Sequence, residues 1–559
     1  MIGMGRVCVA EYLVRACAEL GVRHFFGVDG ANIETVFDAA CGPVPRGGVG
    51  VRGVVAKHEF AAATMADGYA RATGGLGVVA ATSGGGAMNL VAGLAESFTS
   101  GVPVLALVGQ PPRDHDGRGA FQDTSGLAGS IDAARLFAAV SRFCARVERA
   151  QDLPAHFAAA VEAALSGGPA VLLLPKDVQC ADAGVVRRRS VSSSDASATP
   201  TGLSAVAAAL RAVPATDTIV MIAGEQVRAD DARGALRELA GVLGASVAVT
   251  PDSKDVYGPR DPGYCGVAGA MGHPELLDVV RSAELCVLVG TRLPLIARPS
   301  LGDIPIVSVG AQSPYVPAVH VSSSNLAASL SELSVMMRGT RSGPPVSDRR
   351  RHDRPRQTPS RLRPPVATGP GLRYQVVMET ISELLPTGSA VFVDAGNTGA
   401  AAVHHLDLPL GGRFSLALGM GGMGYSFGAA IGSVFADRRP TYVIAGDGSF
   451  FMHGMEVHTA IEYALPITFV ILNNNAHAMC VVRDRLYGRN HDNRNRFHSA
   501  RLAEGMAAMF PGLDCHTVRG TPELRAVLST PCVRGPRFVE IECDPDEIPP
   551  FAPFLAALG

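Results

Sequence analysis

The chain has 559 residues, of which 47% are hydrophobic and 18% are charged, and its formal net charge at pH 7 is −2. Such a length exceeds what a single hydrophobic core supports and predicts about three domains. Because the net charge is close to zero, no broad attraction to nucleic acid or to a membrane surface is expected, and both classes of partner are excluded.

The eleven cysteines are scattered and include no CxxC pair, which is typical of a reducing compartment and predicts a cytoplasmic protein. Near the start of the chain, Glu11 and Glu19 recur at an amphipathic helical spacing. This pattern predicts a first helix rather than a signal peptide. No apolar run reaches the roughly 20 residues that a membrane-spanning helix needs.

Residues 1–182 alternate between helical and extended patterns. A helix is predicted over 59–72, and the predicted strands are 24–28, 51–56, 77–82, 102–108 and 170–174. The alternation is typical of a doubly wound parallel sheet.

A polar linker over 183–202 separates this unit from a second α/β unit over 203–335. The strands predicted for the second unit are 218–223, 246–250, 285–290 and 304–309. Residues 336–367 are rich in Arg, Pro and Ser, and we interpret them as a solvated linker rather than a nucleic-acid patch because aromatic residues are missing there.

Residues 368–559 form a third α/β unit with strands predicted at 390–393, 414–418, 442–445 and 467–472. A helical stretch over 454–464 lies between the last two strands, so a right-handed strand–helix–strand crossover is expected. The predicted fold class is therefore α/β, with three doubly wound parallel-sheet domains.

Oxygen-bearing residues follow two strands of the third unit: GDGS at 446–449 and NNN at 473–475. In an open α/β sheet, ligands bind beyond the carboxyl ends of the strands. One carboxylate, one amide and free carbonyls suit Mg²⁺, which would bring a phosphate-bearing ligand with it. The alternative is ordinary turn chemistry at two strand ends.

Residues 419–424, GMGGMG, match the GxGxxG pattern after a predicted strand, with Asp447 at the end of the next one. A Rossmann dinucleotide site is therefore an alternative on this stretch alone. It explains neither the NN pair at 473–474 nor Glu59, a glutamate in the first turn of the helix predicted over 59–72.

Residues 57–71, KHEFAAATMADGYAR, closely resemble a segment of the acetolactate synthase-like thiamine diphosphate enzymes, which include acetohydroxyacid synthases, pyruvate oxidases and benzoylformate decarboxylases. The GDG and NN segments resemble the metal and diphosphate motif of the same family. By itself, a glutamate in a first helical turn is usually just stabilised by the helix dipole. The resemblance implies instead that Glu59 is the catalytic acid beside the aminopyrimidine, in a dry site that tunes its proton affinity.

Other segments extend the resemblance. Residues 82–90, TSGGGAMNL, are similar to the family's TSGPGATNL turn, and 26–30, FGVDG, to its FGYPG segment. Residues 120–123, AFQD, match the segment whose glutamine, here Gln122, lies beside the thiazolium. The resemblance implies that the three units are, in order, a pyrimidine-binding, a central and a diphosphate-binding domain.

The resemblance also implies residue roles. Asp447, Asn474 and the Ala476 carbonyl would bind the metal, the Gly421 carbonyl would accept a bond from the pyrimidine amine, and Met423 would hold the cofactor bent. The implied catalytic residues are Glu59, Gln122 and Met423. The implied cofactor-binding residues are Gly30, Glu59, Gly396, Asn397, Thr398, Gly421, Met423, Asp447, Gly448, Ser449, Asn474, Ala476, His477 and Met479.

The chain departs from acetolactate synthases in its acceptor region. It contains no Trp, and Arg483 stands where those enzymes carry a tryptophan that restricts the second keto acid. Residues 290–296, GTRLPLI, lack the acceptor-binding arginine of the family's GARFDDR segment. We expect Arg483 to contact the acceptor in its place. Binding of FAD is left open, because 266–269 matches the flavin segment only loosely.

The resulting prediction is a thiamine diphosphate- and Mg²⁺-dependent carboligase, a transferase or lyase of specialised, secondary metabolism. It would decarboxylate a 2-keto acid, pyruvate in the favoured version, and add the acyl group to a bulkier 2-keto acid or aldehyde to give an acyloin. The alternatives are a non-oxidative decarboxylase and a non-catalytic, thiamine-binding regulatory homologue. The resemblance implies a homodimer at minimum, with a homotetramer expected, in which the glutamate domain of one subunit faces the diphosphate domain of its neighbour.

Overall fold

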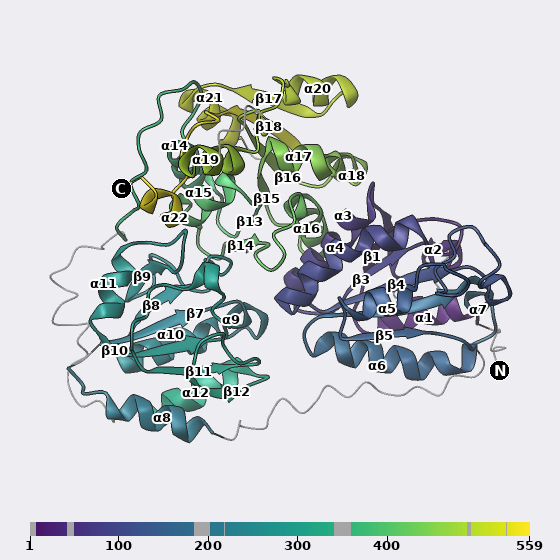
Figure 1. Cartoon of the computed structure of the whole chain (residues 1–559), viewed down its shortest axis with the longest axis horizontal. Coiled ribbons are helices and arrows are strands. Elements are labelled where there is room, and N and C mark those ends of the chain that lie inside the picture. Colours follow the sequence, from purple (N-terminus) through teal and green to yellow (C-terminus); the bar gives the residue numbers. More distant parts are fainter. Residues whose placement is uncertain are drawn as a thin grey trace.

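The computed structural model describes residues 7–41, 50–183, 202–216, 218–339, 359–488, 494–530, 532 and 534–558. Within these ranges the chain forms three six-stranded parallel sheets with interleaved helices (Figure 1). This architecture confirms the predicted α/β fold class. The predicted linkers 183–202 and 336–367 lie mostly outside the described residues, and the domain boundaries stay a prediction.

The first sheet has the strand order β2-β1-β3-β4-β6-β5. Its strands are β1 (His24–Val28), β2 (Arg52–Val55), β3 (Gly77–Ala81), β4 (Val104–Gln110), β5 (Phe143–Arg146) and β6 (Pro169–Pro175). Its helices are α1 (Val9–Glu19), α2 (Glu34–Cys41), α3 (Glu59–Thr73), α4 (Gly85–Ser100), α5 (Ala133–Ala138), α6 (Leu153–Leu165) and α7 (Lys176–Gln179). Strand β5 was not predicted from the sequence, because it is a half-buried edge strand without an apolar run.

The central sheet has the order β12-β11-β10-β7-β8-β9. Its strands are β7 (Thr218–Ala223), β8 (Ser246–Val249), β9 (Tyr264–Val267), β10 (Ala283–Val289), β11 (Ile306–Gly310) and β12 (Val319–Ser322). Its helices are α8 (Leu203–Ala212), α9 (Gln226–Ala229), α10 (Arg233–Leu243), α11 (Glu275–Arg281) and α12 (Leu326–Met337). The sequence did not predict the edge strands β9 and β12, each only four residues long.

The third sheet has the order β14-β13-β15-β16-β18-β17, the same topology as the first sheet. Its strands are β13 (Ala390–Val393), β14 (Arg413–Leu416), β15 (Thr441–Gly446), β16 (Ile467–Asn473), β17 (Asp514–Val518) and β18 (Arg537–Glu542). Its helices are α14 (Tyr374–Leu384), α15 (Asn397–His405), α16 (Tyr425–Ala436), α17 (Asp447–His453), α18 (Val457–Glu462), α19 (Ala478–Leu486), α20 (Leu502–Met509), α21 (Thr521–Leu528) and α22 (Ala552–Ala556).

The crossover between β15 and β16 differs in detail from the prediction. The predicted helix over 454–464 is a short 3-10 turn, η4 (Gly454–Glu456), followed by α18, and a further helix, α17, begins directly after β15 at Asp447. The GDG segment therefore forms a helix start and not an extended loop.

Alternate residues of the strands point into different cores, as the period of two requires. In β13, Ala390 and Phe392 join an apolar cluster that also contains Phe26 and Val79 of the first sheet. On the other face of β13, Val391 joins a cluster shared with the central domain. The third domain is therefore packed against both of the others.

Helices α3 and α16 form the contact between the first and third domains, near the centre of Figure 1. Three glycines allow this close approach: Gly68 of α3, and Gly428 and Gly432 of α16. A Cβ atom added to Gly68 would lie 2.0 Å from the Ala429 carbonyl oxygen, and one added to Gly432 would lie 1.9 Å from that of Met65. Only glycine permits the two helix backbones to come so close.

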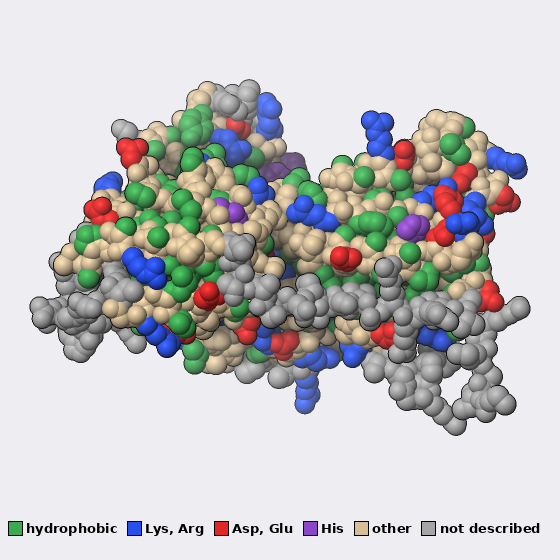
Figure 2. Space-filling view, turned by 90° about the horizontal axis from the view of Figure 1, so that it is seen from below, with side chains coloured by type: hydrophobic (Ala, Val, Ile, Leu, Met, Phe, Trp, Pro, Cys, Tyr) green, Lys and Arg blue, Asp and Glu red, His purple; other side chains and the backbone are tan. Residues whose placement is uncertain are grey.

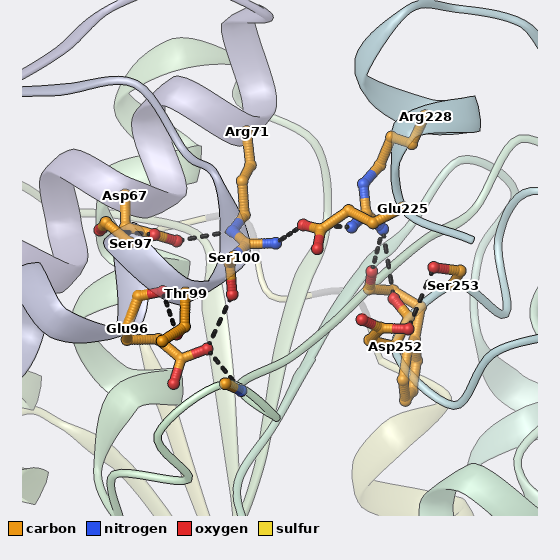
Figure 3. Close-up of polar contacts among 12 residues, drawn as sticks. Asp67, Arg71, Glu96, Ser97, Thr99, Ser100, Glu225, Arg228, Asp252 and Ser253 are labelled. Carbon is orange, nitrogen blue, oxygen red and sulfur yellow. Dashed lines mark hydrogen bonds and ion pairs between the residues drawn. The ribbon is translucent and has the colours of Figure 1, made fainter. Parts of the chain in front are cut away.

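A chain of buried ion pairs crosses from the first domain to the central domain (Figure 3). Arg71 of α3 contacts Asp67 at 2.6 Å and also pairs with Glu225, which in turn pairs with Arg228 at 3.2 Å. Tyr425 of α16 donates its hydroxyl to the same Asp67 at 2.5 Å. Buried ion pairs lose much of their Coulombic energy to desolvation, but removal of one partner here would leave an uncompensated charge at the contact between the domains.

On the face shown in Figure 2, Lys and Arg side chains are interspersed with Asp and Glu side chains. Among the described helices, none has both the length and the apolar character required to cross a lipid bilayer.

Gly432→Ala is expected to lower the free energy of unfolding by about 1–3 kcal/mol, because the new Cβ would overlap the α3 backbone. Gly241→Ala in α10 is the matched control, since a Cβ there meets nothing within 4 Å and alanine favours the helix by up to about 1 kcal/mol. Urea unfolding measures both changes. A Gly432→Ala variant as stable as the wild type would contradict the close α3–α16 contact.

Candidate active site

The three predicted metal ligands lie together at the carboxyl edge of the third sheet. Strands β15 and β16 are parallel neighbours, with Gly446 beside Leu472, so the residues that follow them emerge at the same edge. The Ala476 N–H donates to Asp447 Oδ2 at 3.2 Å and to Asn474 Oδ1 at 3.1 Å. Asn475 adopts a left-handed φ of 51°, which asparagine tolerates and which turns the chain back toward Asp447.

The Asp447 carboxyl group is buried, with 1% of the residue exposed. Burial raises the pKa of Asp447 to about 6, although backbone N–H donors oppose the shift. The groups that oppose the shift of this pKa are backbone N–H donors, with no cationic side chain among them. A bound divalent cation would stabilise the ionised form, so the donor chemistry here fits Mg²⁺. In the described ranges no cluster of three or more His, Cys, Asp or Glu could hold a metal, so this candidate site depends on amide and carbonyl oxygens as well.

The N-terminus of α15 lies at the same sheet edge. Gly396 precedes the helix with φ 90°, and Asn397 and Thr398 are buried in its first turn. A Cβ on Gly446 would lie 3.6 Å from Thr398 Oγ1, which places this turn beside the GDG segment. The Asn397 Oδ1 atom is buried without a hydrogen-bond partner, a polar group that an ordered ligand or water would satisfy.

The opposite end of α15 is held by the central domain. Lys254 Nζ donates to the carbonyl oxygens of Ala402, Val403 and Leu406 at 2.9, 2.5 and 2.6 Å. A cation at a helix C-terminus is favourable because of the helix dipole. The central domain therefore fixes the helix whose first turn faces the metal residues.

Asp394 joins three segments of the predicted cofactor site, and the sequence did not identify it as a site residue. Its carboxylate accepts hydrogen bonds from the Gly424 N–H at 2.9 and 3.0 Å, from the Ser426 hydroxyl at 2.7 Å and from the Ser449 hydroxyl at 2.8 Å. Asp394 thus ties the end of β13 to the glycine-rich loop and to the GDG helix. The sequence signals were its position at a strand end and the resemblance of residues 394–398 to a diphosphate loop of the family.

Met423 contacts the GDG segment. A Cβ on Gly448 would lie 3.2 Å from the Met423 Cε atom and 2.7 Å from His477 Nδ1, so only glycine fits between them. His477 is half-buried and packs edge-on against Phe497, with ring centroids 4.7 Å apart. Gly421, with a left-handed φ of 64°, is exposed at the surface of the glycine-rich loop.

Glu59 is the first residue of α3 and is 9% exposed. Asn89 donates its Nδ2 to Glu59 Oε2 at 2.8 Å, and a Cβ on Gly86 would lie 3.0 Å from Glu59 Oε1. The TSGGG turn therefore surrounds the glutamate with backbone. Asn89 is a second residue that sequence reasoning did not single out, although it lies inside the quoted 82–90 segment.

Gln122 and Gly30 lie on the other side of the same turn. Thr82 donates its hydroxyl to Gln122 Oε1 at 3.2 Å, and a Cβ on Gly30 would lie 2.9 Å from Thr82 Cβ. Gln122 has a left-handed φ of 62°, a strained conformation for this residue type. Such strain is typical of functional sites, where the surrounding structure holds it.

The glutamate half and the diphosphate half face each other within one chain. A Cβ on Gly422 would lie 3.4 Å from the Phe60 ring, and Phe60 stacks on His453 with centroids 4.3 Å apart. Burial lowers the pKa of His453 to about 4, so the stacked ring is neutral. The structure thus brings the residue after Glu59 against the residue before Met423. The contribution of a neighbouring subunit stays a prediction.

Two predicted residues lie apart from this cluster. Arg483 is exposed on α19, with no hydrogen bond or ion pair of its guanidinium to any part of the chain that the structure describes. Met479 is half-buried and packs against the apolar cluster of Val482, Ile548 and Phe554.

The segment compared with a flavin motif has a packing role. A Cβ on Gly269 would lie 2.2 Å from the Ile296 carbonyl oxygen in the 3-10 turn η3 (Leu295–Ala297). The glycine is needed for this contact whether or not a flavin binds, and FAD stays an open prediction.

Comparison with known protein families identifies the class. Three family models match the chain: the N-terminal TPP binding domain of thiamine pyrophosphate enzymes over residues 8–129, their central domain over 206–311 and their C-terminal TPP binding domain over 394–541. The chain therefore belongs to the thiamine pyrophosphate, or thiamine diphosphate, enzymes.

Individual relatives define the branch of the family. The chain is 27% identical to acetolactate synthase isozyme 2 large subunit of Escherichia coli (strain K12), over 83% of this chain and 82% of the relative. It is 27% identical to the probable acetolactate synthase large subunit of Methanocaldococcus jannaschii, over 86% and 82%. It is 24% identical to sulfoacetaldehyde acetyltransferase of Castellaniella defragrans, over 90% and 85%. Within its class the protein is an acetolactate synthase-like, carbon–carbon bond-forming enzyme.

Asp394→Asn is expected to weaken thiamine diphosphate binding by about tenfold or more, because an amide N–H₂ would face backbone donors that now meet a carboxylate. Ser426→Ala is the control, since it removes one hydroxyl donor and keeps the carboxylate, and its loss should be smaller. Isothermal titration with the cofactor in the presence of Mg²⁺ measures both. Equal affinity of Asp394→Asn and wild type would contradict this role.

Proposed function

We propose that the protein is a thiamine diphosphate- and Mg²⁺-dependent carboligase that joins the acyl group of one 2-keto acid to a second carbonyl compound. The observation that carries this proposal is the position of Glu59. It is buried at the start of α3, and its neighbour Phe60 packs against Gly422 of the glycine-rich loop.

Residues at the edge of the third sheet would hold the cofactor. Asp447 and Asn474 offer side-chain oxygens and Ala476 offers its carbonyl to the metal, while Gly448, Ser449 and the first turn of α15 would bind the diphosphate. An anion at the N-terminus of α15 is favoured by the helix dipole and by free N–H groups. The three proposed metal ligands are all hard oxygen donors, which suit Mg²⁺.

When bound, thiamine diphosphate supplies a carbon nucleophile for the keto carbonyl and takes up the electron pair released with CO₂. The chain supplies the acidic group, Glu59, and the side chains that shape the cofactor site. Asn89 donates a hydrogen bond to Glu59 Oε2, so Oε1 would be the atom that exchanges a proton with the pyrimidine ring. Met423, held against Gly448, would support the bent cofactor, and the apolar Phe60 would keep water from the reacting atoms.

The acceptor is proposed to be a 2-keto acid or aldehyde bulkier than pyruvate, with pyruvate as the donor. The chain contains no Trp, so the side chain that restricts the acceptor in acetolactate synthases is missing. A relative whose name is sulfoacetaldehyde acetyltransferase aligns over 90% of this chain, which supports variation in the acceptor within this branch.

Self-association is also part of the proposal. Met420, Phe451, Met452 and Met455 border the site and are between 41% and 58% exposed. Clustered exposed apolar side chains of this kind are typical of interaction surfaces, and they support a homodimer or homotetramer. All eleven cysteines are free, which supports a cytoplasmic location.

Glu59→Gln is expected to lower kcat with pyruvate by about 10²- to 10⁴-fold, because the amide cannot exchange a proton with the pyrimidine. Cofactor affinity should change little, since the diphosphate and metal contacts lie elsewhere. The experiment is a keto-acid panel with thiamine diphosphate and Mg²⁺, with products identified by mass spectrometry. Acyloin from the wild type supports the carboligase, aldehyde alone supports a decarboxylase, and full activity of Glu59→Gln contradicts the mechanism.

Arg483→Ala is expected to raise the acceptor KM about tenfold and to leave the donor KM unchanged, because a guanidinium–carboxylate contact would be lost. Arg281→Ala, a change to an exposed arginine of the central domain, is the control. Steady-state kinetics with each substrate varied in turn measures the effect. An unchanged acceptor KM would refute the assignment of Arg483.

A further inference from the structure

A buried carboxylate of the diphosphate domain holds the segment that leads into Glu59. Glu456, the last residue of η4, is 1% exposed. Its Oε1 atom accepts the backbone N–H groups of Lys57 at 2.8 Å and His58 at 3.0 Å, and its Oε2 atom accepts the Thr459 hydroxyl at 2.9 Å. The two peptide groups just before the catalytic glutamate are therefore fixed by the other domain.

A buried carboxylate of the first domain holds the segment that leads into Met423. Glu96 of α4 is 2% exposed. Its Oε1 atom accepts the Ser100 hydroxyl at 2.9 Å (Figure 3). The same oxygen accepts the Gly419 N–H at 3.1 Å, and Oε2 accepts the Met420 N–H at 2.6 Å. These two amides begin the loop that carries Gly421 and Met423.

The two contacts are related by the shared topology of the domains. Helix α3 follows β2, and α16 follows the equivalent strand β14. Glu96 lies on the helix after β3, and Glu456 lies in the helical segment after the equivalent strand β15. In each domain, an acid in the helical segment that follows β3 or its equivalent β15 therefore holds a loop of the other domain. The loop held by Glu96 precedes α16, and the loop held by Glu456 precedes α3.

We propose that Glu96 and Glu456 are reciprocal positioning residues: before the cofactor binds, Glu456 fixes the segment that leads into Glu59, and Glu96 fixes the loop that carries Met423. The inference rests on the proposed function, in which those two residues contact the pyrimidine. Neither Glu96 nor Glu456 needs to touch substrate or cofactor. Their effect is to fix two successive peptide groups on each side of the domain contact.

The chemistry of the two contacts explains why acids are used. A buried backbone N–H must find an acceptor, and a carboxylate oxygen can receive two such donors. Hydrogen bonds to an ionised acceptor are shorter and stronger than neutral ones. Burial raises the pKa of Glu456 to about 7, and the hydrogen bonds from Thr459, Lys57 and His58 oppose this shift.

The two sites differ in a way that can be tested. Glu456 receives both amides on one oxygen, so glutamine can keep that oxygen in place and turn its N–H₂ toward the Thr459 hydroxyl, which can accept. Each carboxylate oxygen of Glu96 accepts one backbone N–H. A glutamine at this position would therefore turn its own NH₂ group toward a backbone N–H, and two donors would face each other. Glutamine should therefore rescue position 456 and fail at position 96.

The test is hydrogen–deuterium exchange with mass spectrometry on the full-length protein without cofactor, following peptides that cover 52–60 and 416–424. Glu456→Ala is expected to speed exchange in 52–60 by tenfold or more, and Glu96→Ala to do so in 416–424. Glu456→Gln should exchange like the wild type, whereas Glu96→Gln should resemble Glu96→Ala. Thr459→Val and Ser100→Ala are the matched controls, because each removes the hydroxyl partner and keeps both backbone contacts.

Kinetics provides the second readout. Glu456→Ala and Glu96→Gln are expected to lower kcat at least tenfold while the keto-acid KM stays within about twofold, since the substrate contacts are intact. Unchanged exchange in both alanine variants, or a glutamine pattern opposite to that expected, would overturn the positioning role. Absence of thiamine diphosphate binding by the wild type would overturn the proposed function instead, and the exchange data would still decide the positioning role.

Discussion

The close contact between helices α3 and α16 is the constraint on which the rest of the structure depends. Backbones can approach this closely only where Gly68, Gly428 and Gly432 leave no side chain between them. The contact joins the apolar cores of the first and third sheets into one cluster, so the two domains cannot move apart without exposing it. Since α3 begins at Glu59 and α16 follows the glycine-rich loop, the same contact decides how the acid faces the cofactor-binding loop.

Around this contact, buried carboxylates accept hydrogen bonds from loop segments and so hold those segments in place. Asp394 collects donors from the glycine-rich loop and the GDG helix, and Glu96 and Glu456 each receive two amides from the opposite domain. Burial of such groups is costly unless every oxygen is hydrogen-bonded, and here the donors are largely backbone N–H groups. A site built in this way is preorganised, because its loops are fixed by partners that do not take part in the chemistry.

The cofactor side and the acceptor side of the proposed site are built differently. The cofactor half has the buried Asp447 carboxylate and the Asn474 side-chain oxygen, both of which accept the Ala476 N–H, and matches to the family cover it on both domains. The acceptor half is marked by an absent tryptophan and an exposed Arg483. Relatives with different printed activities align over similar shares of the chain, which agrees with a common core and a variable acceptor side.

The sequence by itself determined the α/β class and most of the buried strands, and it predicted which residues would form the metal site, because apolar runs and strand-end motifs are local patterns; the buried strand β18 (Arg537–Glu542) was missed. Asp447 and Asn474 could be paired in advance, since carboxyl ends of neighbouring parallel strands share one edge. Short edge strands such as β5 (Phe143–Arg146) escaped prediction because they are half-buried and carry no apolar run. Only the tertiary structure decided the roles of Asn89, Glu96 and Glu456. The groups that they hold, Glu59 and the backbone amides of Gly419 and Lys57, lie between 30 and 399 residues away along the chain, and no local spacing encodes such contacts.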